Sequence, residues 1–276
     1  MSPIGCLFFL LPALCPALSQ QTPDPLNPDY TAQPFEDWER KFADFTFHKF
    51  EEDGHVLPYR LYSPDSMEPG KTYPLVIFMH GAGERGIDNR IQLRNFRSTV
   101  EFWKKYPCFV IAPLCPRRDQ APEGVWVETQ FGSSVGHTMK EQPTWPLHLA
   151  LDAIDQFIAT HPVDRQRIYV TGLSMGGFAT WEILQRRGEM IAAAAPVCGG
   201  ADTAFAGKLT SIPIWATHGD ADDIVPVSRS RDIVAAIKAA GGNPKYTEFP
   251  GVKHDAWTPT YSNPDIWDWM FSQSKN

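Results

Sequence analysis

The chain has 276 residues, of which 43% are hydrophobic and 21% are charged, and its formal net charge is -7. This length and composition are typical of a soluble globular domain with a substantial apolar core. Because the net charge is negative and no block of lysine or arginine stands out, we expect no nucleic-acid partner.

The first 19 residues, "MSPIGCLFFLLPALCPALS", are uncharged and have an apolar centre. Ala17 and Ser19 are small residues at the spacing of a signal-peptidase site, although the usual basic residue before the apolar run is missing. Residues 1–19 therefore predict a signal peptide and a secreted or periplasmic protein. The apolar run is short for a membrane span, so we expect no stable membrane insertion. Residues 20–34 are rich in proline and predict an extended lead-in, and residues 35–276 predict a single catalytic domain.

The domain begins with two alternating segments that predict strands, residues 45–54 and 55–65, with Asp53-Gly54 as the turn between them. Continuous apolar runs and amphipathic segments then alternate, which predicts a mostly parallel sheet covered by helices on both faces. The expected strands are 74–79, 108–116, 167–174, 191–200, 212–220 and 245–251, and the expected helices are 91–106, 147–160, 175–187, 227–242 and 265–273.

The segment "VTGLSMGGF" places Ser174 between Gly172 and Gly176, after an expected strand and before an expected helix. Gly-x-Ser-x-Gly in that setting predicts a nucleophile elbow, a tight turn that exposes the serine hydroxyl at the carboxyl edge of the sheet. The alternative, a serine that merely caps the helix, would need no glycine on either side. Ser174 is therefore the predicted nucleophile, and the amide of Met175 is a predicted oxyanion donor.

A serine nucleophile needs a histidine base and an acid that orients it, in the chain order serine, acid, histidine. His254 follows the last expected strand and is the predicted base, because His218, the other histidine after Ser174, would precede the acidic residues. Three aspartates compete for the role of the acid, and spacing alone does not separate them: Asp220, Asp222 and Asp223.

Four segments in this order, "HGAGERG", "GLSMGG", "HGDADDIVP" and "HDAWTPTY", resemble the α/β-hydrolase superfamily. More narrowly, residues 45–271 resemble secreted esterases related to polyhydroxybutyrate depolymerases and to feruloyl and acetylxylan esterases, a group that also contains proposed peptidases. The resemblance implies the α/β-hydrolase fold and places the acid at Asp222. It also implies an oxyanion amide at Ala82, with Gly83 assisting, whereas His80 is expected to hold that loop by hydrogen bonds.

The long segment from Arg117 to Pro146 has little periodicity but several aromatic residues, so we expect it to form one wall of the substrate cleft. Trp126 and Trp257 are the candidate substrate contacts. In the strand order of the resembled fold, two strands separate the ends that carry Cys115 and Cys198. We therefore expect Cys108, Cys115 and Cys198 to be free thiols.

The leading hypothesis is a serine esterase that cleaves carboxylic esters through an acyl-enzyme, with a small-molecule or polymeric substrate, such as a polysaccharide-linked ester or a polyester. A small serine peptidase is the alternative, because both reactions pass through a tetrahedral intermediate. A non-catalytic binding module on the same fold ranks below both, because all three triad residue types are present. The sequence predicts no cofactor and no metal site.

Overall fold

A single eight-stranded sheet organises residues 36–275, the part of the chain that this computed structural model describes. The predicted signal peptide and lead-in, residues 1–34, lie outside the described residues. The strands are β1 (Thr46–Glu52), β2 (His55–Tyr62), β3 (Tyr73–Met79), β4 (Phe109–Pro113), β5 (Val163–Leu173), β6 (Ala193–Val197), β7 (Trp215–Gly219) and β8 (Lys245–Phe249).

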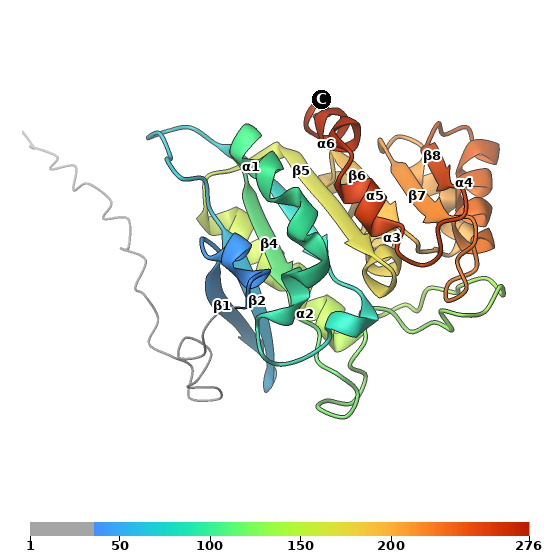
Figure 1. Ribbon diagram of the computed structural model, residues 1–276, viewed down its shortest axis with the longest axis horizontal. Coiled ribbons are helices and arrows are strands. Elements are labelled where there is room, and N and C mark those ends of the chain that lie inside the picture. The colour runs from blue at the N-terminus through green and yellow to red at the C-terminus, as the bar shows by residue number, and fades with distance from the viewer. Residues whose placement is uncertain (1–35, 276) are drawn as a thin grey trace, which may run out of the picture. The chain divides into compact units, whose positions relative to one another are not determined.

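The strands lie in the order β1-β2-β4-β3-β5-β6-β7-β8 (Figure 1). β2 pairs antiparallel with both β1 and β4, and every other neighbouring pair is parallel, so the expectation of a mostly parallel sheet is confirmed. The expected hairpin is also present, with positive φ angles at Asp53 (48°) and Gly54 (77°), as a tight two-residue turn requires. Because β3 to β8 run in one direction, their carboxyl ends share one edge, where ligands bind in open α/β sheets.

Alternate side chains of the central strands enter two separate apolar cores. On β3, Leu75, Ile77 and Met79 belong to one core, whereas Val76 and Phe78 belong to the other. All seven residues of β3 are buried, which explains why this strand appears in the sequence as a continuous apolar run.

Helices cover both faces of the sheet. The first core contains side chains of α2 (Trp145–Thr160), α3 (Met175–Arg187) and α4 (Ser228–Ala239). The second contains side chains of α5 (Trp257–Tyr261) and α6 (Pro264–Phe271), which lie in front of the sheet with α1 (Val100–Lys105) in Figure 1. Short 3-10 helices complete the elements: η1 (Glu39–Phe42), η2 (Ala82–Glu84), η3 (Ile91–Thr99), η4 (Gly188–Met190) and η5 (Thr203–Leu209).

Three details differ from the sequence prediction. The expected helix at residues 91–106 is a 3-10 helix up to Thr99 and becomes α-helical only at Val100. Its start is held by Asp88, whose Oδ1 accepts hydrogen bonds from the amides of Arg90 and Ile91. The strand β5 begins at Val163, four residues before the expected start. The short helices η5 and α5 were not expected, because segments of five to seven residues carry too little periodicity to be recognised.

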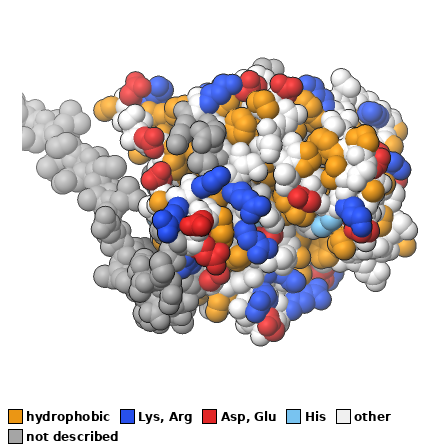
Figure 2. All heavy atoms as spheres, in the orientation of Figure 1, with side chains coloured by type: hydrophobic (Ala, Val, Ile, Leu, Met, Phe, Trp, Pro, Cys, Tyr) orange, Lys and Arg blue, Asp and Glu red, His pale blue; other side chains and the backbone are white. Residues whose placement is uncertain are grey.

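All three cysteines of the described region are free and buried, as expected. β3 and β5 lie between β4, which Cys115 follows, and β6, which Cys198 follows. Among the described residues, no helix is long and apolar enough to cross a membrane. Figure 2 shows acidic and basic side chains beside one another on the face that carries α1, α5 and α6.

Candidate active site

Ser174 occupies the sharp turn between β5 and α3. Its backbone has φ 54° and ψ -119°, a conformation that costs a residue with a side chain roughly 1–3 kcal/mol. The turn is held by two backbone hydrogen bonds, from the Ser174 amide to Val197 O (3.0 Å) and from the Phe178 amide to Ser174 O (3.0 Å). Although Ser174 precedes the first residue of α3, its hydroxyl makes no capping hydrogen bond. The hydroxyl is therefore available for another partner.

The three glycines around Ser174 are required by the close approach of neighbouring backbones. A Cβ on Gly176 would lie 1.9 Å from Met79 O at the end of β3, and a Cβ on Gly177 would lie 2.2 Å from Val197 O at the end of β6. On the other side of the serine, a Cβ on Gly172 would lie 2.4 Å from Gly176 O. The strands on either side of β5 thus press against the turn, which leaves no room for a Cβ atom at these three positions.

His254 lies in the loop after β8, where its Nε2 is 2.9 Å from Ser174 Oγ. Its ring stands edge-on to the half-buried ring of Trp257 at a centroid distance of 5.3 Å. The position of Trp257 beside His254 is compatible with its predicted role as a substrate contact. The thiol of Cys198 lies 3.7 Å from His254 O, on the buried side of the loop.

The geometry separates the three candidate acids. Asp222 Oδ2 accepts a hydrogen bond from His254 Nδ1 at 2.8 Å. Asp220 instead accepts from the amide of Gly251 at 2.7 Å, and Asp223 pairs with Lys253 at 2.8 Å. Of the three aspartates, Asp222 is the one that contacts the histidine, in the position that the resemblance implies.

Asp222 is held as a carboxylate by four donors. Its Oδ1 accepts from the amides of Ile224 and Val225, both at 2.9 Å, and its Oδ2 lies 3.2 Å from Nε2 of a second histidine, His218, in addition to His254. Burial acts to raise the pKa of Asp222, but the hydrogen bonds from His218, His254 and the two amides outweigh it and hold that pKa well below its usual value. The group that faces His254 is therefore negatively charged at neutral pH.

The predicted oxyanion donors are both first residues of helices. Met175 begins α3 and Ala82 begins η2, and the first amides of a helix have no acceptor within it. The two turns are adjacent, because a Cβ on Gly81 would lie 2.7 Å from Leu173 Cδ1. Gly83, the predicted assistant, lies on the exposed side of η2 and has no atom near its Cβ position.

His80 holds the loop that carries Ala82 by hydrogen bonds, as expected, and does so from a fully buried position. Its Nδ1 donates to Gly81 O at 2.7 Å, and its Nε2 accepts from the amide of Cys115 at 2.9 Å. Burial lowers the pKa of His80 from 6.5 to about 3, so the ring is neutral and each nitrogen has one fixed role.

The prediction that Trp126 contacts substrate is wrong. Its side chain is 0% exposed within the core that α2 and α3 cover, so no ligand can reach it. Its Nε1 donates to His80 O at 3.2 Å, and its ring lies edge-on to that of His80. A tryptophan gains most from burial when its N–H finds an acceptor inside, and His80 O supplies one. Trp126 therefore anchors the long segment to the body of the domain.

Residues 129–139 of the long segment are attached to the body of the domain by Arg229 of α4 and by Asp202, which precedes η5. No sequence pattern singles out either side chain. Arg229, 3% exposed, donates to Val135 O and to Thr129 Oγ1, and its guanidinium lies over the Phe178 ring. Asp202 Oδ2 accepts from the Met139 amide at 2.9 Å. These contacts place the segment beside the turn of Asp222: a Cβ on Gly132 would lie 3.3 Å from Ile224 O.

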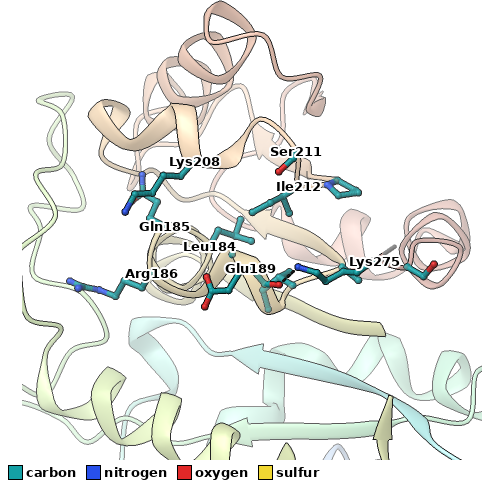
Figure 3. A pocket seen from close by; sticks show the side chains of 13 residues that line it. Leu184, Gln185, Arg186, Glu189, Lys208, Ser211, Ile212 and Lys275 are labelled. Atoms are coloured by element: carbon teal, nitrogen blue, oxygen red, sulfur yellow. Dashed lines mark hydrogen bonds between the residues drawn. The ribbon is translucent and has the colours of Figure 1, made fainter. Parts of the chain in front are cut away.

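A pocket of about 750 Å³ lies away from this site (Figure 3). Its lining comes from the end of α3, from η5 and from the segments that precede β6 and β7, together with Lys275. It is therefore at the amino edge of the strands, opposite Ser174, and has no part in the arrangement above.

Two groups of described residues have the spacing of metal ligands. Cys198, Asp222 and His254 form one, but hydrogen bonds within the triad already use the facing atoms of Asp222 and His254. Glu52, His148 and Asp152 form the other, on the surface between β1 and α2, where His148 is more than half exposed.

Comparison with known proteins gives the same picture of the fold. A model described as the Dienelactone hydrolase family matches residues 128–263 of the chain. The crystal structure of a thermostable esterase is 38% identical to the chain with a TM-score of 0.74, and the match covers 84% of this chain and 64% of that one.

Two further relatives match less closely. A bifunctional acetylxylan esterase/xylanase, XynS20E of Neocallimastix patriciarum, is 26% identical over 175 residues, which are 63% of this chain and 22% of that protein. The structure of a ferulic acid esterase is 16% identical with a TM-score of 0.60 and covers 83% of this chain and 98% of that one, a likeness of fold alone. The chain thus spans about a fifth of the length of this acetylxylan esterase/xylanase and 64% of the thermostable esterase.

Proposed function

We propose that this chain, which belongs to the α/β-hydrolase superfamily, hydrolyses carboxylic esters through an acyl-enzyme on Ser174. The observation that carries the proposal is the continuous hydrogen-bonded series from Ser174 Oγ through His254 to Asp222, at 2.9 Å and 2.8 Å. The hydroxyl leaves a strained turn at the carboxyl edge of the sheet, next to two helix-initial amides. An esterase needs this combination of nucleophile, base, acid and oxyanion donors.

The first half-reaction forms the acyl-enzyme. Ser174 Oγ attacks the ester carbonyl carbon while His254 Nε2 takes the hydroxyl proton. The carbonyl oxygen becomes an oxyanion, which the amides of Met175 and Ala82 stabilise by hydrogen bonds. His254 then gives its proton to the alcohol oxygen, the carbon–oxygen bond breaks, and the alcohol leaves.

The second half-reaction repeats these steps with water. His254 removes a proton from water, the resulting hydroxide attacks the acyl carbon, and the acid leaves when Ser174 recovers its proton from His254. Asp222 remains ionised throughout, because its hydrogen bonds keep its pKa low, and it holds Nδ1–H so that Nε2 faces the serine. No step requires a cofactor.

We further propose that the protein is exported, since residues 1–19 have the character of a signal peptide, and that its ester is carried on a polysaccharide or is part of a polyester. The acetylxylan esterase/xylanase among the similar proteins favours the polysaccharide-linked ester. Trp257 beside His254 and the long segment beside the turn of Asp222 are the surfaces that would select the acyl and alcohol parts.

A panel of chromogenic esters with acetyl, butyryl, feruloyl and long acyl groups tests the proposal, with a peptide anilide beside them. We expect hydrolysis of at least one ester and little hydrolysis of the anilide. Ser174→Ala should lower kcat by about 10⁴- to 10⁶-fold with an unchanged thermal midpoint. Retention of a tenth of the wild-type rate would exclude Ser174 as the nucleophile, and preferential cleavage of the anilide would favour the peptidase.

A matched pair of variants tests the acid. Asp222→Asn and Asp220→Asn make the same change two residues apart, but only Asp222 contacts His254. An amide at Asp222 favours the wrong tautomer of the histidine, so we expect a loss of about 10⁴-fold in kcat there and a far smaller loss at Asp220. A larger loss at Asp220 would mean that the acid is misassigned.

A further inference from the structure

His218 is a buried titratable side chain at the active site that the mechanism above does not use. It lies near the end of β7 and is 0% exposed. Its Nε2 is 3.2 Å from Asp222 Oδ2 and 3.0 Å from Val225 O, and its Nδ1 is 2.8 Å from Ser230 Oγ. Each ring nitrogen thus has a defined partner, and these partners determine where the ring carries its protons.

The Nε2 atom faces two groups that can only accept hydrogen bonds. Val225 O is a carbonyl oxygen, and Asp222 is an ionised carboxylate whose pKa is held low by its hydrogen bonds. A bare Nε2 would place its lone pair against both oxygens in a site closed to water, which is strongly unfavourable. Nε2 must therefore carry a proton, shared between the two oxygens.

The Nδ1 side permits two arrangements. Ser230 Oγ lies 2.8 Å from Gly199 O, to which it can donate its single proton. In that case Ser230 accepts from Nδ1–H, and His218 is an imidazolium paired with Asp222. If the hydroxyl turns toward Nδ1 instead, His218 is neutral with its proton on Nε2. The proton on Nε2 is common to both arrangements.

We propose that His218 is a positioning residue that donates its Nε2–H to Asp222 and thereby fixes the carboxylate that orients His254. With the amides of Ile224 and Val225 on Oδ1 and two histidines on Oδ2, the carboxylate cannot rotate about its Cβ–Cγ bond without losing a donor. The effect on catalysis rests on the proposed function, because it requires that His254 act as the base.

Two amide substitutions at the same position separate positioning from simple packing. The amide nitrogen of glutamine reaches approximately the place of Nε2, so His218→Gln keeps a donor toward Asp222. The shorter asparagine amide reaches only the place of Nδ1, next to Ser230. We expect His218→Asn to lower kcat on the best ester about 10- to 100-fold with KM nearly unchanged, since small errors in the placement of a reacting group are costly, and His218→Gln to restore most of that loss.

Ser230→Ala serves as the control, because it removes the partner of Nδ1 and leaves the Nε2 bond in place. We expect its kcat to stay within a few-fold of the wild type, with a modest fall in thermal midpoint. Equal kcat values for the asparagine and glutamine variants, both folded, would overturn the proposal, since a packing role does not distinguish the two ends of the ring.

Histidine NMR of the wild-type protein labelled with ¹⁵N and ¹³C tests the proposal without substitutions or substrate. We expect the His218 signals to show a protonated Nε2 and its coupling across the bond to Asp222. A resonance pattern with a bare Nε2 would overturn the proposal even if the substituted proteins fail to fold. This readout does not depend on ester hydrolysis. Failure of the ester panel would therefore count against the proposed function, whereas the NMR spectrum alone would decide the placement of His218.

Discussion

The turn at Ser174 and the long segment of residues 117–144 lie at the same edge of the sheet but are held in different ways. The turn is fixed by backbone against backbone, with Gly176 pressed on Met79 O and Gly177 on Val197 O. The long segment has few regular elements and is fixed by single side chains, the indole of Trp126 and the guanidinium of Arg229.

This difference determines how each region responds to change. A contact between two backbones allows no substitution that adds an atom, so the turn should fail completely when any of its glycines is replaced. A contact made by one side chain can be removed by one substitution, so the segment should lose its attachments to the domain one at a time. Substitutions in the two regions should therefore differ in how much stability they cost and in how many residues they affect.

The largest expected effect is that of Gly176→Ala. The new Cβ would lie 1.9 Å from Met79 O, and backbone of β3 in the centre of the sheet cannot move away. We expect a loss of more than about 4 kcal/mol in the free energy of unfolding, or no folded protein at all, measured by denaturant titration.

Gly136→Ala is the matched control in the long segment. Nothing lies within 4 Å of its Cβ position, and its φ angle is not positive. The unfolding free energy of this variant should equal that of the wild type within error. A stable Gly176→Ala protein would show that the turn is less constrained than its backbone contacts imply.

The second effect is that of Trp126→Ala. Removal of a fully buried tryptophan leaves a cavity and a carbonyl without its donor, and it should cost about 3–5 kcal/mol. Because Trp126 does not contact substrate, kcat/KM should fall by the same factor for every ester in the panel. A change in the relative rates of acetyl and feruloyl esters at an unchanged thermal midpoint would restore the rejected interpretation of Trp126 as a wall of the cleft.

The third effect is that of Arg229→Met, which keeps the aliphatic contact with Phe178 but removes the hydrogen bonds to Val135 O and Thr129. We expect a loss of about 1–3 kcal/mol, because the segment loses two hydrogen bonds from a charged donor. Hydrogen exchange should become faster in residues 129–139 and stay unchanged in the turn at Ser174.

Arg231→Met, two residues further along α4, is the control for this variant. Arg231 pairs with Glu248 on the exposed surface, and exposed pairs contribute little. Its thermal midpoint and its exchange pattern should match those of the wild type. Faster exchange throughout the protein in Arg229→Met would mean that Arg229 supports the whole core and not this segment.

The same contrast explains what could be predicted from the sequence. Strands such as β3 are buried on both faces and appear as continuous apolar runs, so the sheet and its parallel direction could be predicted. The turn at Ser174 could be predicted because its glycines are close to it in sequence. Ser174, Asp222 and His254 come together as the chain order and the resemblance imply.

The remainder depends on contacts between residues distant in sequence, for which the chain carries no local signal. In the sequence, nothing distinguishes Trp126 from any other aromatic residue of an irregular segment, because its acceptor, His80 O, lies 46 residues away. Arg229 resembles a surface residue of an amphipathic helix, although it is buried against a segment about a hundred residues earlier. His218 differs from these two, because it lies only four residues before Asp222. Chain order excludes it as the base, and the sequence pattern carries no sign that its ring turns toward that carboxylate.

The smallest effect is a dependence of stability on pH that originates at His80. Its ring bonds Gly81, which lies against Leu173 beside the turn, and Cys115, and its carbonyl accepts from Trp126 of the long segment. Its pKa falls from 6.5 to about 3 in the folded protein because burial disfavours the charged ring. Between these values the unfolded chain binds a proton that the folded protein does not, so the free energy of unfolding should fall as the pH falls below 6.5, by about 1.4 kcal/mol per pH unit from this residue.

Denaturant titrations from pH 7.5 to pH 5 measure this slope. The slope of His80→Gln, whose amide oxygen can still accept from the Cys115 amide, should be less steep than that of the wild type by that amount. An unchanged slope in His80→Gln would mean that the loop that carries Ala82 admits water and that His80 is not the neutral link between the turn and the long segment.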